Sequence, residues 1–244
     1  MEKNTSWKRV GGWYKGLVGG KGHYYHQKII MPGVLRIIKS GKVADLGCGT
    51  GILGRYLKDN VYLGVDLAKN LIEEAKRLDG NPKHKYIIGD ITKKLEIGSD
   101  FNWVAVILSL QNVKRPFGVV ENAKRLLAKN GKLLIVINHP AFRIPKHADW
   151  ITRDNKQFRV VDGYMSHLEI PIDSSPFDQK NNQTSWSYHY PLSAYSEMLE
   201  DNGFLIEKIE EWVSDKVSTG GAAKMENQSR REIPMFMMLV ACQR

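Results

Sequence analysis

Short apolar runs alternate with helical patterns along the first 140 residues. The predicted strands cover residues 42–47, 61–66, 84–90, 101–110 and 131–138, and helical patterns lie at 52–60 and 119–128. At 68–78, the sequence AKNLIEEAKRL places Leu71, Ile72, Ala75 and Leu78 on one helix face. Strands that alternate with helices favour a mostly parallel sheet, so we predict an α/β, doubly wound, Rossmann-like fold.

The pattern changes after residue 138. Residues 139–190 are rich in Pro, Asp, Asn, Ser and aromatic side chains and show no clear period, so we expect an inserted lid between the fifth strand and the next helix, or a binding loop or disordered segment. A helix with Gly203 at its C-cap and strands at 204–212 and 235–242 follow. The glycine-rich stretch 217–234 reads as a loop that borders the pocket or is disordered.

Length and composition fit one domain. The 244 residues, 42% of them hydrophobic, can bury a sizeable core, so we predict a single domain over 1–244 with an N-terminal region at 1–40. The first thirty residues contain no continuous apolar stretch of the kind found in signal peptides, and no apolar run approaches the length of a membrane span. We therefore expect a cytoplasmic protein without a membrane partner. Cys48 and Cys242 are too few for a disulfide framework or a metal cluster, and we predict no metal.

The formal net charge of +10 is concentrated near the N-terminus. Residues 1–40 hold one acidic residue, Glu2, and eight basic residues, which are Lys3, Lys8, Arg9, Lys15, Lys21, Lys28, Arg36 and Lys39. This asymmetry fits either a solvated basic face or attraction to an anionic substrate or RNA.

The glycine-rich stretch KVADLGCGTGILG at 42–54 carries two conflicting signals. Gly49, Gly51 and Gly54 have the G-x-G-x-x-G spacing of a dinucleotide site. Asp45, however, would repel a pyrophosphate and attract a cationic ligand tail. The glycines therefore predict a nucleotide-like ligand, and the aspartate favours one that carries a positive charge.

Two further aspartates end the next two strands. Asp66 follows the first loop glycine at the distance expected of an acid that binds ribose hydroxyls, and Asp90 offers an acceptor for an adenine amino group. An adenosine with a cationic tail and no phosphate matches all three aspartates. We therefore predict S-adenosylmethionine as the cofactor, in preference to NAD.

The successive motifs VADLGCGTG, GVDLAKNLIEEAK, YIIGDI and ILSLQNVKRP…RLLAKNGKLLIVINHP resemble those of class I S-adenosylmethionine-dependent methyltransferases of the small-molecule, methyltransferase-11-like type. The resemblance covers roughly residues 24–140. It implies a seven-stranded sheet whose last strand is antiparallel. It also implies cofactor contacts from Tyr25, His26, Asp45, Gly47, Gly49, Gly51, Asp66, Leu67, Asp90, Ile91, Ser109 and Leu110.

Histidines are the candidate catalytic residues. Methyl transfer is an in-line displacement, and an alcohol, phenol or protonated amine must also lose a proton, whereas a neutral amine, thiol or activated carbon can react without a base. His139, which directly follows the fifth predicted strand, is our first candidate for a general base. His189, just before the helix at 192, is the second.

The 139–190 insertion is expected to contact the substrate. Its aromatic and arginine side chains suit a planar or anionic molecule, and Arg143 and Trp150 are the expected contacts. We predict a methyltransferase that acts on an O, N or C nucleophile of a small molecule. An RNA methyltransferase and a catalytically silent cofactor-binding module remain alternatives, and the sequence does not indicate an oligomeric state.

Overall fold

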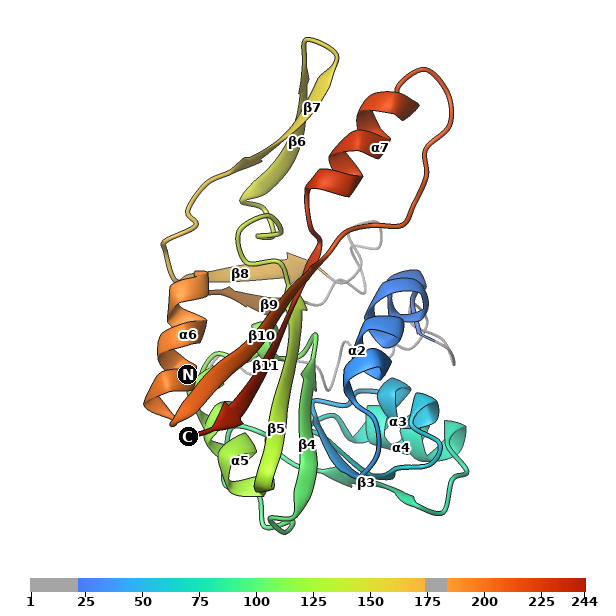
Figure 1. Cartoon of the computed structure of the whole chain (residues 1–244), viewed down its shortest axis with the longest axis vertical. Coiled ribbons are helices and arrows are strands. Elements are labelled where there is room, and N and C mark those ends of the chain that lie inside the picture. The colour runs from blue at the N-terminus through green and yellow to red at the C-terminus, as the bar shows by residue number, and fades with distance from the viewer. Residues whose placement is uncertain (1–21, 174–183) are drawn as a thin grey trace.

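The computed structural model describes residues 22–173 and 184–244. A seven-stranded sheet with helices on both faces forms its body (Figure 1). The strand order is β10-β11-β5-β4-β1-β2-β3. The pairs β1–β2, β2–β3, β1–β4 and β4–β5 are parallel, whereas β11 runs antiparallel to both β5 and β10. The predicted α/β, Rossmann-like sheet with an antiparallel last strand is confirmed.

The sheet strands are β1 (Lys42–Leu46), β2 (Val61–Asp66), β3 (His84–Ile88), β4 (Phe101–Ile107), β5 (Leu127–Asn138), β10 (Phe204–Trp212) and β11 (Phe236–Gln243). The helices of the body are the π-helical turn η1 (His26–Ile30), α2 (Met31–Ile37), α3 (Ile52–Tyr56), α4 (Lys69–Leu78), the 3-10 turn η2 (Leu110–Asn112), α5 (Pro116–Leu126) and α6 (Leu192–Asp201). Helix α6 ends as predicted, because Gly203 adopts a φ of +75° and its N–H donates to the Glu200 carbonyl.

Each face of the sheet has its own apolar core. On one face, α5 and α6 bury side chains such as Val119, Ala123 and Leu199 against the strands. On the other, α2, α3 and α4 bury side chains such as Val34 and Ile72. Strands covered on both faces read as continuous apolar runs, which is why the sequence predicted them well.

Two segments differ from the sequence prediction. The insertion is not one irregular loop: it contains the antiparallel hairpins β6 (Ala148–Arg153) with β7 (Lys156–Val161) and β8 (Leu168–Asp173) with β9 (Thr184–His189). The 217–234 stretch, expected to be a loop, contains helix α7 (Ala223–Glu232). Helix α7 has one buried residue, Ser229, and strands β6 and β7 are largely exposed, so these elements show no clear apolar period. Strand β9 is mostly buried, but it is short and gives no distinctive pattern.

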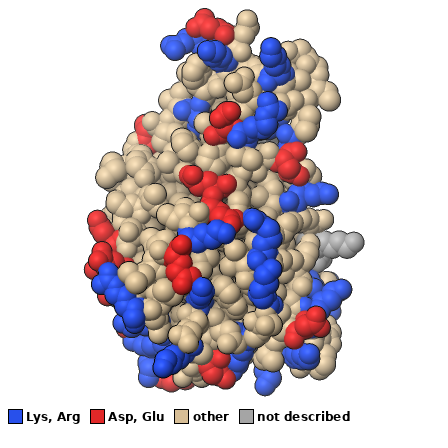
Figure 2. Space-filling view, in the orientation of Figure 1, with Lys and Arg blue, Asp and Glu red and all other residues tan. Residues whose placement is uncertain are grey.

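Hairpin β6–β7 and helix α7 project together from the end of the body where the parallel strands finish (Figure 1). On the face shown in Figure 2, acidic side chains lie among the basic ones. Arg36, for example, pairs with Glu210 at 2.8 Å. The basic residues up to Lys21 lie outside the described residues. Within the described part of the chain, no helix has the length and apolar character needed to cross a membrane.

Candidate functional site

The carboxyl ends of β1, β2, β3 and β4 meet at one edge of the sheet. The N–H groups of Gly47 and Cys48 donate to the Val65 carbonyl at 2.8 and 3.1 Å, which folds the glycine loop over the end of β2. The N–H of Gly89 donates to the Asp66 carbonyl at 3.0 Å and holds the end of β3 beside it. Ligands of open α/β sheets bind at this edge.

The glycine loop, residues 47–51, has a shape that only glycine allows at two positions. Gly47 has a φ of +82°, and a Cβ there would lie 2.4 Å from the Cβ of Ser109. Gly51 has a φ of +71°, and its Cβ would lie 2.5 Å from the ring of Tyr86. The backbone therefore turns tightly and remains open to close approach by a ligand.

Asp66 holds this loop in place. Its carboxylate accepts hydrogen bonds from the N–H of Gly49 at 2.8 Å and from the N–H of Ala68 at 2.9 Å. Burial is the main cause that raises its pKa from the usual value, and the backbone N–H groups oppose that rise. Leu67, which follows Asp66, is 37% exposed and is available to a ligand at this edge.

Asp90 folds back on its own turn. Its Oδ1 accepts hydrogen bonds from the N–H and hydroxyl of Thr92, at 3.0 and 2.6 Å, and its Oδ2 lies 3.8 Å from the Lys93 ammonium. Ile91 beside it is 8% exposed and belongs to the α5-side core. The Asp90 side chain therefore has one oxygen that is free of hydrogen bonds within the described residues.

The structure separates Ser109 from Leu110, which the sequence placed together beside the cofactor. The Ser109 hydroxyl donates to the Leu46 carbonyl at 2.8 Å, and its side chain packs against Gly47. Leu110 is 1% exposed and packs in the core on the face covered by α5. Of the pair, Ser109 therefore lies at the glycine loop, whereas the Leu110 side chain is buried in the core.

Asp45 lies beneath the loop. It is 3% exposed, and its Oδ2 accepts a 2.6 Å hydrogen bond from the Tyr62 hydroxyl. Burial raises the pKa of Asp45 to about 7, partly offset by Tyr62 and reinforced by the nearby Asp66. The carboxylate expected to face a cationic tail is therefore buried below the loop, where burial favours its protonated form.

The N-terminal helix adds His26 and Tyr25 near this edge. His26 packs against Gly22, which itself approaches Ile52 at the start of α3, and burial lowers the pKa of His26 to about 4. The buried Nδ1 of His26 and the buried hydroxyl of Thr50 in the loop have no hydrogen-bond partner among the described residues. These two polar atoms, the strand-end aspartates and the open glycine loop fit an adenosine-bearing ligand.

The first candidate base, His139, already has partners at both ring nitrogens. Its Nε2 lies 2.6 Å from a carboxylate oxygen of Glu211, and its Nδ1 accepts the N–H of Ala141 at 3.2 Å. Its ring also packs on Phe142, with 4.8 Å between the centroids. This arrangement leaves no nitrogen to accept a substrate proton, so the structure argues for a role in shaping the turn after β5.

His189 is arranged differently. Its Nε2 lies 2.8 Å from the Tyr164 carbonyl, which can only accept, so Nε2 carries the proton and Nδ1 has the free lone pair of the neutral ring. Burial lowers the pKa of His189, which keeps the ring neutral near pH 7. A neutral histidine with a free nitrogen is the form that acts as a general base.

His189 lines a small cavity at the ends of β4 and β5. The cavity measures about 20 Å³, room for about one water molecule. It is lined by Gln111, Asn138, Pro140, Arg143, Pro145, Ser187, Tyr188, His189 and Tyr195. Arg143, one of the two expected substrate contacts, is therefore beside His189.

Trp150, the other expected substrate contact, lies elsewhere. It is on strand β6 of the projecting hairpin, 37% exposed, with the Arg159 guanidinium 5.1 Å from its ring. Because β6 and β7 extend away from the body (Figure 1), the structure does not bring Trp150 together with Arg143 in the cavity.

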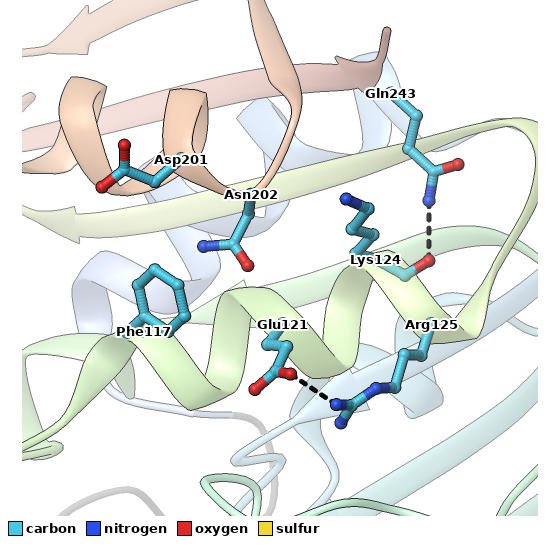
Figure 3. A pocket seen from close by; sticks show the side chains of 7 residues that line it. All are labelled: Phe117, Glu121, Lys124, Arg125, Asp201, Asn202 and Gln243. Carbon is cyan, nitrogen blue, oxygen red and sulfur yellow. Dashed lines mark hydrogen bonds and ion pairs between the residues drawn. The ribbon is translucent and has the colours of Figure 1, made fainter.

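A wider cavity of about 530 Å³ lies between α5 and α6 (Figure 3). Its lining residues are Phe117, Glu121, Lys124, Arg125, Asp201, Asn202 and Gln243. Glu121 pairs with Arg125, and Gln243 donates to the Lys124 carbonyl. Most of this groove lies toward the edge where the parallel strands begin, away from the glycine loop, so its size does not make it the ligand site.

Sequence reasoning missed Tyr62, Thr50 and Gln111. Gln111 follows the fourth strand directly, and a polar residue at a strand end is a signal that could have been used. Tyr62 lies within a strand and Thr50 within the glycine loop, and neither position is distinctive in sequence. Only the fold, in which β2 pairs with β1, shows which groups surround these side chains.

Residues 44–135 match the model of the methyltransferase domain family. The match spans β1 to β5 and contains the glycine loop and the aspartates that end β2 and β3. Residues 44–135 therefore carry a methyltransferase domain, and the strand order is that of the class I methyltransferase fold. The domain match supports an enzyme with S-adenosylmethionine as its cofactor.

Solved structures show the same fold. A methyltransferase from Mesorhizobium loti described as S-adenosylmethionine-dependent is 21% identical with a TM-score of 0.68, covering 86% of this chain and 95% of its own. A putative methyltransferase in complex with the Haloferax volcanii Trm112 activator is 14% identical with a TM-score of 0.65, covering 99% and 97%. The glycopeptide N-methyltransferase MtfA with sinefungin is 15% identical with a TM-score of 0.59, covering 88% and 86%. A search of curated proteins finds no match.

Proposed function

We propose that this enzyme methylates a small molecule bound at the opening of the small cavity between β4, β5 and the β8–β9 hairpin, with one polar group reaching the side chains that line it, and that His189 removes the acceptor's proton. The observation that carries the proposal is the neutral His189, with Nδ1 free, in a cavity that adjoins the glycine loop through residues 109–111. Segment 139–190 supplies Arg143 and His189 and is thus the substrate-binding insertion.

The cofactor would be held by the glycine loop, Asp66 and Asp90, with Tyr25 and His26 beside it. When bound, S-adenosylmethionine supplies an electrophilic methyl group. His189 accepts the proton of the acceptor's hydroxyl or ammonium group at Nδ1, while the Tyr164 carbonyl keeps the Nε2 proton in place and orients the ring. The buried walls of the cavity exclude water, which would otherwise compete for the base.

The test is a screen with methyl-labelled S-adenosylmethionine, offered a fractionated metabolite extract and, separately, total RNA. We expect the label in a small-molecule fraction. His189→Asn should then lower turnover by about 10²- to 10⁴-fold, the usual contribution of a general base, with cofactor affinity unchanged.

His139→Asn is the matched control, because His139 is a second buried histidine at the same edge. It should lower the melting temperature through loss of the Glu211 contact and retain most of the turnover. Wild-type turnover in His189→Asn would refute the proposed base. Label in the RNA alone would favour the RNA alternative, and cofactor binding without any labelled product would favour a silent module.

A further inference from the structure

Arg143 is partly buried, and its guanidinium has no acidic partner among the described residues. Its Nη1 is shielded from solvent and makes no hydrogen bond within the described residues. Its guanidinium carbon lies 4.9 Å from the centroid of the Phe236 ring, which fixes the side chain by a cation–π contact. In the described part of the chain, no carboxylate lies within ion-pair distance of it.

This arrangement is unfavourable for the protein by itself. Burial lowers the pKa of Arg143, and the neighbouring positive charge of Arg159 lowers it further. A guanidinium nevertheless stays protonated at neutral pH, so the positive charge remains. A buried charge is normally paired, because leaving it unpaired costs free energy. This free-energy cost indicates that the Arg143 charge is paired with a ligand that is not part of the chain.

The small cavity beside Arg143 has room for one polar group of that partner. Gln111 also lines it, and its buried Oε1 likewise has no hydrogen-bond partner among the described residues. The cavity thus presents a cationic donor and an amide group that are both unpaired. Both residues line the same cavity as His189.

The cavity also adjoins the cofactor edge by two routes. Gln111 is two residues from Ser109, which packs on Gly47 of the glycine loop. Phe236, on which Arg143 lies, also contacts the Tyr25 ring at 5.8 Å. A molecule paired with Arg143 would therefore lie close to the expected cofactor.

We propose that the methyl acceptor carries an anionic oxygen group, a carboxylate or a phosphate, which binds the Arg143 guanidinium, and that the Gln111 amide binds a polar group of the same molecule. This inference rests on the proposed function, because it names the substrate class for the same site. The two proposals can be tested separately, because anion binding can be measured without turnover.

The test measures binding of three small probes to the full chain loaded with S-adenosylhomocysteine: benzoate, phenyl phosphate and the neutral benzamide. Isothermal titration should show binding of at least one anion and at least tenfold weaker binding of benzamide. Whether benzoate or phenyl phosphate binds more tightly tells a carboxylate from a phosphate. Arg143→Met should lose about 30-fold or more in affinity for the anion, as expected when one partner of a buried charge pair is removed.

Two further measurements separate ligand binding from a structural role. Arg159→Met removes a neighbouring positive charge that does not line the cavity, and it should change anion affinity by less than about threefold. Without a probe, Arg143→Met should melt at the same temperature as the wild type or above it, because a buried unpaired charge has been removed. A structural arginine would instead lower the melting temperature when replaced.

The proposal fails if neither anion binds to the loaded wild type, if benzamide binds as tightly as the anions, or if Arg143→Met keeps wild-type affinity. Any of these results would still be compatible with the proposed function, with a neutral molecule as the methyl acceptor. Conversely, anion binding that depends on Arg143, together with unchanged turnover in His189→Asn, would keep the anion site and reject the proposed base.

Discussion

At the residue scale, the glycine loop rests on buried polar groups. Asp45 and Tyr62 share a hydrogen bond beneath the loop, and the Asp66 carboxylate binds the N–H of Gly49 within it. Asp45 is nearly inaccessible to water, so its charge is costly unless a cation lies nearby. A sulfonium or ammonium group above the loop would favour the ionised form of Asp45, which links cofactor binding to its protonation.

Asp45 makes stability depend on pH. Its folded pKa of about 7 lies above the ordinary value of 3.8, so the folded protein keeps a proton that the unfolded chain releases. The free energy of unfolding should therefore fall as the pH rises from about 4 to about 7, by at most about 4 kcal/mol, and then level off.

Asp45→Asn removes this proton and retains an oxygen that can accept from Tyr62. Urea unfolding between pH 4.5 and 8, without cofactor, should show a smaller fall for Asp45→Asn than for the wild type. Parallel profiles for the two proteins would mean that Asp45 does not titrate in this window.

Asp66 is the residue whose loss should affect cofactor binding most directly. Asp66→Ala removes the carboxylate proposed to bind the ribose hydroxyls and frees the N–H of Gly49. Loss of a charged hydrogen bond costs about 1.5–3 kcal/mol, so we expect S-adenosylmethionine to bind about 10- to 150-fold more weakly by titration calorimetry. The exposed Asp59→Ala is the control, and equal affinity of the two variants would remove Asp66 from the site.

At the element scale, the two hairpins of the insertion have different environments. Strand β9 buries Ser187, Tyr188 and His189 at the cavity, whereas β6 and β7 are largely exposed. The β6–β7 hairpin is attached to its surroundings by a hydrogen bond from Arg159 to the Phe142 carbonyl and by contacts with α7. The β6–β7 hairpin therefore projects from the body, whereas the β8–β9 hairpin contributes side chains to the cavity lining.

Replacement of residues 149–160 by a short glycine linker tests this distinction. Because the removed strands bury little apolar surface, we expect the melting temperature to change by only a few degrees. S-adenosylmethionine affinity by titration calorimetry should stay within about twofold, since these residues make no contact with the glycine loop. A large loss of cofactor affinity would show that the hairpin supports the site. A control that replaces Tyr188 by Ala should instead impair turnover.

At the scale of the whole molecule, ligand chemistry is concentrated at one edge of the sheet. The parallel strands finish there, and the glycine loop, the strand-end aspartates and the cavity of Arg143 and His189 all lie at that edge. The wider groove between α5 and α6 lies mainly toward the opposite edge. Size alone would select the groove between α5 and α6, whereas strand direction favours the smaller cavity lined by Arg143 and His189.

The sequence by itself determined the sheet, its helices and the class of ligand. Strands such as β1 and β5 are buried on both sides, and buried strands appear as apolar runs whatever their neighbours are. The loop was equally readable, because positive φ angles and close contacts at Gly47 and Gly51 require glycine. Asp66 and Asp90 were predicted as ligand contacts because parallel strands bring their carboxyl ends to one edge of the sheet.

Only the tertiary structure distinguished the environments of the candidate histidines and arginines. His139 and His189 look alike in sequence, yet Glu211, 72 residues away, engages one, and the Tyr164 carbonyl fixes the tautomer of the other. Arg143 and Trp150 were equivalent candidates until the fold placed one in a cavity and the other on an exposed hairpin. Side chains that depend on long-range contacts leave no local pattern, because their partners are set by packing and not by spacing along the chain.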